Sequence, residues 1–342
     1  MTYDKTVSAA LPQRTLGKDL AVSAVSYGAM GISEFYGPSD DATSLDILSE
    51  VAASGITLID TADMYGNGHN EELIGRLLRT RDREPGVEKL KIATKCGIDR
   101  RDSSYARSIN NRPEYIRASC EASLRRLGVE RIDLYYIHRV DPDADITETM
   151  ECLRELVDEG KIDHVGLCEV SAQTLAKAHA VHPITALQTE YSLWTRDIET
   201  EILPMARDLG VGVVAYSPLG RGFLTGRITS TDTLAKGDFR RSNPRFQGEN
   251  LEHNLELLDK VRQVADRHHA TPGQVALAWL LAQDDSIVPI PGTRRSHYLQ
   301  ENLGAINLDL TAFDLADIEA SLPIDAAYGA RYTQEGMKGV NV

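Results

Sequence analysis

Four side chains that can exchange protons or hydrogen bonds follow short apolar runs of the sequence: Asp60, Tyr65, Lys95 and His138. A positive charge stabilises a phenolate, so a buried lysine beside Tyr65 should lower the pKa of the phenol from about 10. A carboxylate would keep that lysine charged, and a neutral imidazole can hydrogen-bond a carbonyl group. These groups together predict general acid catalysis at a carbonyl oxygen, a step that accompanies hydride arrival at the carbon.

Each of these residues also has an ordinary structural interpretation that the sequence leaves open. Asp60 could cap a helix or close a turn, and Lys95 could be a surface charge. His138 could be a buried histidine with satisfied hydrogen bonds, and Tyr65 could simply pack in its glycine-containing turn. The catalytic interpretation is favoured because chance would not often place all four residue types at three consecutive strand ends.

Short apolar runs rich in Val, Ile, Leu or Tyr recur at fairly regular intervals. Several lack polar alternation, as expected for parallel strands that are covered on both faces. The runs are residues 24–27, 57–60, 90–95, 132–138, 164–168, 186–190, 211–216 and 286–290. Segments of helical period lie between most of them and end at glycine in several cases, namely residues 41–53, 113–127, 146–159, 200–209, 251–268 and 272–283.

Eight strands that alternate with helices predict an α/β fold of the (β/α)8 TIM barrel type. The turn after the first run reads Gly28-Ala29-Met30-Gly31, which is not the GxGxxG of a doubly wound dinucleotide-binding sheet. A small β-hairpin around Gly17-Lys18 should precede the barrel, and the long interval 217–285 should hold a loop after strand seven plus helices. No compositional break divides the chain, so we expect one barrel domain over residues 1–342.

The charge balance limits the classes of partner. The chain has 37 Lys and Arg against 51 Asp and Glu, a net charge of −14, which argues against nucleic acid and gives no reason to expect an anionic membrane. No apolar run approaches the length of a membrane span, and the N-terminal segment lacks the apolar core of a signal peptide. We therefore expect a soluble, cytoplasmic protein. The four cysteines are spaced neither for zinc nor for a small disulfide scaffold, and no metal is expected.

A series of short motifs runs in order along the predicted barrel. They are LIDTADMYG (58–66) with NEELIG (70–75), IATK (92–95), LRRLG (124–128) with IDLYYIH (132–138), GKI (160–162), LQTEYSL (187–193), AYSPLGRG (215–222), and IPGTR (290–294) with ENLGA (301–305). This ordered set resembles the aldo-keto reductase family. It is most similar to the branch that contains bacterial, fungal and plant reductases and the β subunits of potassium channels.

The resemblance implies a role for each proton-handling residue. Tyr65 would be the general acid, Lys95 and Asp60 would tune its pKa, and His138 would orient the carbonyl. It also implies a small-molecule carbonyl substrate and an NADP(H) cofactor that lies extended across the barrel mouth without a Rossmann fold. We expect the substrate pocket to contain Tyr65, His138 and Trp194. Trp194, Phe35 and Tyr36 lie on predicted loops at the mouth, and Trp194 is the best candidate of these three. The loops after Gly28, Tyr105 and Phe223 would set the selectivity of the pocket.

The resemblance further implies the cofactor contacts. Tyr216 would stack on the nicotinamide, and Gln188 would hydrogen-bond the carboxamide. The pyrophosphate would follow the backbone of Ser217, Pro218, Leu219, Gly220, Arg221 and Gly222, the 2′-phosphate would meet Gly292, Thr293 and Arg294, and the adenine would lie near Gln300, Glu301 and Asn302. The expected contacts are completed by Gly28, Met30, Asp60 and Cys168.

Two features of these positions affect the cofactor site. Arg294-Arg295 would be a solvated surface pair in isolation, but after a Gly-Thr turn it suits a dianionic phosphate. Such a local basic pocket is what an acidic chain needs in order to bind NADPH. The family commonly has Ser-Asn after strand five, whereas this chain has Cys168-Glu169, and an ionised glutamate cannot donate to a carboxamide. Cys168 is equally well explained as a small buried residue.

The expected function is therefore NADPH-dependent reduction of an aldehyde or ketone to an alcohol. One alternative is a regulatory protein, similar to the potassium-channel β subunits, that binds NADP(H) and turns over little. Another is a metal-dependent barrel hydrolase that would use Asp60, His138 and Asp63 and would lose activity on chelation. The sequence leaves open whether the protein is a monomer or a homo-oligomer.

Overall fold

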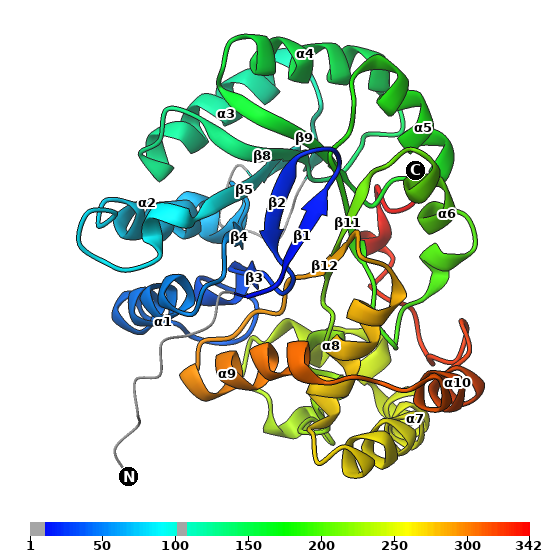
Figure 1. Ribbon diagram of the computed structural model, residues 1–342. Helices are drawn as coiled ribbons and strands as arrows, with labels where there is room; N and C mark the ends of the chain where they lie inside the picture. Colours follow the sequence, from blue (N-terminus) through cyan, green and yellow to red (C-terminus); the bar gives the residue numbers. More distant parts are fainter. Residues whose placement is uncertain (1–10, 101–107) are drawn as a thin grey trace.

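Eight parallel strands form a barrel with helices around it in the computed structural model, which describes residues 11–100 and 108–342 (Figure 1). The barrel strands, in sheet order, are β3 (Tyr27–Gly28), β4 (Leu58–Asp60), β5 (Lys91–Cys96), β8 (Ile132–Ile137), β9 (Ile162–Cys168), β10 (Ala186–Glu190), β11 (Gly212–Tyr216) and β12 (Ile287–Pro289). Backbone bonds from Ser26 N to Pro289 O (3.0 Å) and from Gly28 N to Pro291 O (3.5 Å) join the first strand region to the last. The predicted TIM barrel is confirmed.

Two glycines allow this closure. A Cβ atom on Gly28 would lie 2.7 Å from the carbonyl oxygen of Ile290, and one on Gly292 would lie 2.5 Å from the carbonyl oxygen of Gly28. Real Cβ atoms do not approach backbone oxygens so closely, so only glycine fits at either position. The ends of the first and last strands therefore meet at the same mouth of the barrel.

The first barrel strand is later and shorter than the predicted residues 24–27. The segment before it is a bend stabilised by serine side chains: Ser23 Oγ donates to Val25 O at 2.8 Å, and Ser26 Oγ donates to Ser23 O at 3.1 Å. These local bonds compete with a sheet ladder, which explains why the strand begins only at Tyr27. Apolar composition alone did not reveal this competition.

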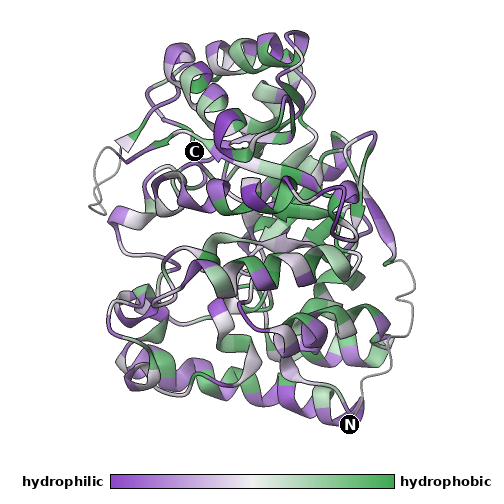
Figure 2. Ribbon diagram, turned by 90° about the vertical axis from the view of Figure 1, so that its left-hand side faces the viewer, coloured by the Kyte–Doolittle hydropathy of each residue, from purple (hydrophilic) through white to green (hydrophobic). Residues whose placement is uncertain are grey.

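Ten α-helices are present in the described residues. They are α1 (Asp41–Ala53), α2 (His69–Leu78), α3 (Pro113–Leu127), α4 (Ile146–Asp158), α5 (Ala172–Val181), α6 (Ile202–Asp208), α7 (Gly248–Arg267), α8 (Pro272–Gln283), α9 (Ser296–Gly304) and α10 (Ala312–Ser321). Local capping fixes several ends: Gly128 follows α3 in the left-handed conformation (φ 69°), and Thr271 with Gln274 forms a capping box on α8. Hydrophobic residues gather on the central strands, whereas the outer helices carry both hydrophilic and hydrophobic residues (Figure 2).

A hairpin covers one end of the barrel, as predicted. Strands β1 (Gln13–Leu16) and β2 (Leu20–Ser23) pair antiparallel, with Arg14 opposite Val22 (Figure 1). The hairpin's Leu16, Leu20 and Val22 are buried in a cluster with the inward-facing barrel residues Leu58, Leu134, Tyr136, Val214 and Val288. Because this packing covers the amino-terminal ends of the strands, the open mouth lies at their carboxyl ends.

The predicted long segment after the seventh barrel strand is present between β11 and β12. It contains short helical turns at Gly220–Thr225, Thr231–Thr233, Phe239–Ser242 and Pro244–Phe246, followed by α7 and α8. Within residues 11–100 and 108–342, no helix is long and apolar enough to cross a membrane. Tyr105, which marks one of the predicted substrate loops, lies outside the described residues.

Candidate active site

A cavity of about 1010 Å³ opens at the carboxyl ends of the barrel strands, the face at which TIM barrels place their ligands. Its volume is at the upper end of the range for small-molecule sites, roughly 300–1,000 Å³. One end is lined by Asp60, Tyr65, His138 and Cys168, and the other by Thr293, Arg294, Arg295, Tyr298 and Asn302.

A buried ion pair lies beneath the first end. Lys95 on β5 donates from Nζ to Asp60 Oδ1 at 2.5 Å and to the carbonyl of Thr61 at 2.7 Å. Gln188 on β10 donates to the second Asp60 oxygen at 2.6 Å, so both carboxylate oxygens are occupied. Burial alone would lower the pKa of Lys95, but the negative charge of Asp60 outweighs it and raises that pKa above its usual value. The lysine is therefore a charged, oriented ammonium at neutral pH.

Tyr65 follows β4 in a short 3-10 turn and reaches this ammonium. Its hydroxyl lies 3.5 Å from Lys95 Nζ, which itself lies 5.0 Å from the centre of the phenol ring. The sequence predicted a pKa below 10 for Tyr65, and this expectation is wrong. Burial raises the pKa of Tyr65 to about 12, and the charge of Lys95 offsets only part of the effect. Tyr65 therefore holds its proton at neutral pH.

His138 completes the group of four residues at this end of the cavity. It directly follows β8, and its backbone N–H donates to the carbonyl of Cys96 at 2.7 Å. Its ring stands edge-on to that of Tyr65, with centroids 5.9 Å apart and an interplanar angle of 85°. The structure thus brings the ends of three neighbouring strands and the turn after β4 together. Asp60, Tyr65 and His138 line the cavity, and Lys95 lies just behind them.

The turn that presents Tyr65 is fixed by two buried residues of the NEELIG segment. Asn70 accepts from Thr61 Oγ1 at 2.6 Å and donates to the carbonyl of Ala29 at 2.9 Å. Glu71 accepts from Thr94 Oγ1 at 2.6 Å and from Arg126 Nε at 2.6 Å. These residues tie α2 to the loops after β3 and β4, to β5 and to α3. Their role is to position the turn, which the sequence reasoning did not assign.

The end of β11 and the loop after it also line the cavity. Tyr216, Ser217, Pro218, Leu219, Arg221 and Gly222 all face it, as the resemblance led us to expect, whereas Gly220 does not. A Cβ on Gly220 would lie 2.8 Å from Cε3 of Trp194, so this glycine permits close packing instead. The guanidinium of Arg221 is buried and donates to Glu190 at 2.6 Å. Its charge is therefore already paired within the protein.

The second end of the cavity is rich in arginine. Arg294 donates to the backbone carbonyls of Tyr36, at 2.8 Å, and Pro38. Arg227 pairs with Glu301 at 2.8 Å and lies 4.1 Å from the ring centre of Tyr298. Gly292, Thr293, Arg294, Glu301 and Asn302 line this end as expected, but the exposed Gln300 does not.

Tyr298 and Arg227 also line this end and were not foreseen. Tyr298 lies three residues before Glu301 on α9, so both project from one helix face, and helical periodicity alone could have identified it. Arg227 comes from an irregular loop, and no pattern in the sequence identifies it.

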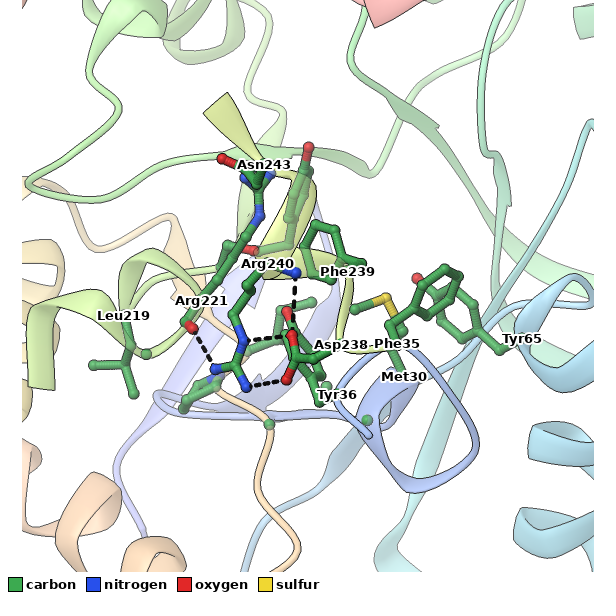
Figure 3. A pocket seen from close by; sticks show the side chains of 18 of the residues that line it. Met30, Phe35, Tyr36, Tyr65, Leu219, Arg221, Asp238, Phe239, Arg240 and Asn243 are labelled. Atoms are coloured by element: carbon green, nitrogen blue, oxygen red, sulfur yellow. Dashed lines mark hydrogen bonds and ion pairs between the residues drawn. The ribbon is translucent and has the colours of Figure 1, made fainter. Parts of the chain in front are cut away.

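Two loops meet across the cavity between its ends (Figure 3). Phe239 N donates to the carbonyl of Phe35 at 3.1 Å, and the Arg240 guanidinium lies 4.8 Å from the ring centre of Tyr36. Arg240 also pairs with Asp238 at 2.6 Å. The loop after β3 and the long loop after β11 thereby form a bridge, and sequence reasoning found only its Phe35 and Tyr36 side.

Trp194 corrects the predicted substrate pocket. It is buried, stacks on Phe223 with centroids 4.0 Å apart, and donates from Nε1 to Asn254 at 3.0 Å. The cavity lining does not include it. Large aromatic side chains bury well where the indole N–H finds an acceptor, and Asn254 on α7 supplies one. Trp194 therefore anchors the long segment after β11 and does not face a substrate.

The two departures from the family pattern behave differently. Cys168 is buried and lines the cavity beside Tyr65. Glu169 has a left-handed backbone (φ 56°), and its carboxylate accepts from Arg331 at 2.8 Å. Burial raises the pKa of Glu169, but Arg331 and Arg139 outweigh it and the net pKa is lowered. Glu169 is therefore an ionised acceptor that is already engaged.

The residues of the hydrolase alternative do not form a set of metal ligands. Within residues 11–100 and 108–342, no three His, Cys, Asp or Glu side chains are grouped so that they could hold a metal ion. Asp60 already accepts from Lys95 and Gln188. An ammonium in direct contact with that carboxylate would repel a cation placed there.

Comparison with known proteins gives a consistent result. The model of the Aldo/keto reductase family matches residues 24–323. The chain is 45% identical over 312 residues to "Probable aldo-keto reductase 1" of Glycine max, covering 91% of this chain and 88% of that protein. It is 42% identical over 325 residues to "Aldo-keto reductase yakc [NADP(+)]" of Schizosaccharomyces pombe, covering 94% of each. Among solved structures, the glycerol dehydrogenase AKR11B4 of Gluconobacter oxydans superposes with a TM-score of 0.82 at 31% identity, covering 92% of this chain and 96% of that one.

Proposed function

The chain belongs to the aldo/keto reductase family, and from this premise we propose that it reduces aldehydes or ketones to alcohols with NADPH. The observation that carries the proposal is the buried Lys95–Asp60 pair beside the protonated phenol of Tyr65. The cavity beside these groups is also lined by Arg227, Arg294 and Arg295. Residues 1–342 would form one such barrel domain.

The cavity fits NADP(H) by size and by the chemistry of its ends. The aromatic ring of Tyr216 at one end offers a flat surface for a nicotinamide, and Arg227, Arg294 and Arg295 at the other suit phosphate groups. The acceptors of Arg294 are uncharged carbonyls, so its positive charge attracts an anion. We therefore expect a preference for NADPH over NADH, and the name of the Schizosaccharomyces pombe relative is consistent with this cofactor.

When bound, the reduced nicotinamide supplies the hydride that reaches the carbonyl carbon. Tyr65 holds the proton at Oη and delivers it to the carbonyl oxygen. Lys95 stabilises the phenolate that remains, because its ammonium lies 3.5 Å from the same oxygen. Asp60 keeps Lys95 charged, and His138 orients the carbonyl against Tyr65. Because burial raises the pKa of Tyr65, the phenol keeps its proton until the substrate is bound. The nearby charge of Lys95 lowers the free energy needed to ionise the phenol in this buried site.

Gln188 has a different immediate partner from the one expected. The resemblance placed it on the nicotinamide carboxamide, whereas its Nε2 donates to Asp60 at 2.6 Å. We propose that it primarily holds Asp60 and that its amide oxygen is the group that faces the carboxamide. Glu169 takes no part in carboxamide binding in this proposal, because Arg331 occupies its carboxylate.

The test uses Tyr65→Phe and a panel of aliphatic, aromatic and sugar-derived carbonyls, with the loss of NADPH absorbance as the signal. We expect the variant to lose carbonyl reduction by at least about 100-fold, the low end of the general acid contribution, while binding of NADPH stays nearly unchanged. Undiminished turnover in the variant would overturn the mechanism. NADPH binding without turnover of any carbonyl by the wild-type protein would favour the regulatory alternative.

A further inference from the structure

The last residues of the chain form part of the cavity wall. Tyr332, Thr333, Glu335 and Gly336 all line the cavity. The end of the segment returns to the barrel (red in Figure 1), where Asn341 N donates to the carbonyl of Glu169 at 2.6 Å, and Ser171 N donates to the carbonyl of Val342 at 3.0 Å. Because backbone bonds to the residue after β9 and to the N-cap residue of α5 hold this end, the segment has a defined place at the mouth.

A buried ion pair anchors the same segment just before Tyr332. The side chains of Glu169 and Arg331 are 2% and 7% exposed, and they pair at 2.8 Å. A second Glu169 oxygen accepts from the backbone N–H of Glu190 at 2.9 Å, so the carboxylate is held by the barrel as well as by the segment. The carbonyl of Arg331 in turn accepts from Arg221 at 2.8 Å and from Asn243 at 3.0 Å. Arg331 is thus fixed at its side chain and at its backbone.

This anchor sets the position of Tyr332, the next residue. The hydroxyl of Tyr332 shares a hydrogen bond with the hydroxyl of Tyr216 at 2.9 Å. The Arg221 guanidinium lies 4.4 Å from the ring centre of Tyr332 and fixes its plane. Tyr216 lies at the end of β11, so its hydroxyl is the part of the side chain farthest from the strand. A hydrogen bond at that point restricts the rotation of the ring into and out of the cavity.

We propose that Tyr332 is a positioning residue for the cofactor: its hydroxyl fixes the ring of Tyr216 at the nicotinamide end of the cavity, and the Glu169–Arg331 pair holds Tyr332 in place. The proposal rests on the proposed function only for the placement of the nicotinamide against Tyr216. It also gives Glu169 a purpose at a position where the family commonly has a carboxamide-binding asparagine. Here Glu169 holds the C-terminal segment in place through Arg331, and Tyr332 of that segment orients the ring of Tyr216.

The test compares two ligands on a variant that keeps every aromatic ring. Tyr332→Phe removes the hydroxyl but retains the ring under Arg221. The ligands are NADPH and adenosine 2′,5′-bisphosphate, which has the adenine and the 2′-phosphate but no nicotinamide. Tyr328→Phe is the matched control, because Tyr328 belongs to the same segment, is 49% exposed, and lies outside the cavity lining. Calorimetric titration gives the dissociation constants without any turnover.

We expect Tyr332→Phe to raise the dissociation constant of NADPH about two- to tenfold, the range for the loss of one hydrogen bond, and to leave the bisphosphate unaffected. Tyr328→Phe should change neither constant. The variant Arg331→Gln should reproduce the selective loss, because it weakens the anchor of Tyr332 while the charge of the buried Arg139 still faces Glu169.

An equal loss of both ligands in Tyr332→Phe would show general loosening of the mouth and overturn the proposal, and so would unchanged NADPH binding. Failure of the proposed function is a separate outcome. It would appear as retained turnover in Tyr65→Phe, whereas the binding comparison judges Tyr332 by itself.

Discussion

The buried pair between Lys95 and Asp60 can be tested by removing one charge with almost no change of shape. In Asp60→Asn, the amide oxygen can still accept from Lys95, and the side chain of Gln188 can turn over to accept from the new amide group. Loss of one partner of a buried ion pair costs about 3–5 kcal/mol. A retained neutral hydrogen bond returns about 1 kcal/mol of this. We therefore expect the free energy of unfolding at pH 7 to fall by about 2–4 kcal/mol.

The stability difference between the wild-type protein and Asp60→Asn should depend on pH, and the pKa of Lys95 sets the direction of this dependence. In the wild-type protein, Asp60 raises the pKa of Lys95 above that of an unfolded lysine, and burial raises the pKa of Asp60 above its usual value. The charged pair therefore exists between these two pKa values, and the contribution of Lys95 is lost only as the pH rises from about 10 through its raised pKa. Without Asp60, burial dominates and lowers the pKa of Lys95. The unfolded variant then binds more protons than the folded variant, so the stability of Asp60→Asn rises with pH. The difference between the two proteins should shrink between about pH 7 and pH 10.

Urea denaturation at several pH values measures this difference. Asp41→Asn is the matched control, because Asp41 forms an exposed ion pair with Arg76 at 2.6 Å, and solvent screens such pairs. Its unfolding midpoint should stay close to that of the wild-type protein. A loss in Asp60→Asn of less than about 1 kcal/mol, or one that does not change with pH, would refute the reasoning that Lys95 and Asp60 form a charged buried pair.

Arg294→Ala should weaken binding of NADPH at least about tenfold more than that of NADH, because only NADPH carries the 2′-phosphate, and equal losses in titrations would place that phosphate elsewhere. Trp194→Ala should lower the free energy of unfolding by about 3–5 kcal/mol in denaturant titrations, since the indole loses its stacking and its hydrogen bond under the long loop; a negligible loss would contradict this packing. Gly292→Ala should lower the melting temperature by several degrees, because its Cβ would lie 2.5 Å from the Gly28 carbonyl oxygen, whereas Gly273→Ala, with no neighbour closer than 3.5 Å, should be tolerated. Similar melting temperatures for the two glycine variants would argue against tight closure of the barrel.

The fold could be predicted because its determinants are local in the sequence. Apolar runs of strand length alternate with helical segments that end at glycine, and both patterns persist in the structure. The error at the first strand arose from serine side chains that bond to the backbone near them, a competition that hydropathy does not measure. The residue types at the strand ends were likewise readable, because the carboxyl ends of parallel strands all meet at one mouth.

What the sequence did not provide was the environment of each side chain. The predicted drop in the pKa of Tyr65 considered the charge of Lys95 and left out burial, which is the larger influence. Arg221 lies in the expected loop, but its charge is paired with Glu190, a residue some thirty positions earlier in the chain. Trp194 was placed at the mouth by its neighbours in sequence, yet the acceptor for its indole N–H comes from α7. Each of these outcomes depends on a contact between distant segments.

At the mouth of the barrel, several contacts between distant segments are buried ion pairs. Three buried ion pairs surround the mouth: Lys95–Asp60 on neighbouring strands, Arg221–Glu190 between the loop after β11 and β10, and Arg331–Glu169 between the C-terminal segment and the residue after β9. Buried pairs add little net stability because both charges are desolvated, but a mispaired arrangement leaves a buried charge alone and is strongly disfavoured. Each pair therefore selects one placement of the element that carries it. Since both partners of every pair belong to the chain itself, these pairs order the mouth without contacts to a ligand, which reduces the binding free energy spent on ordering it.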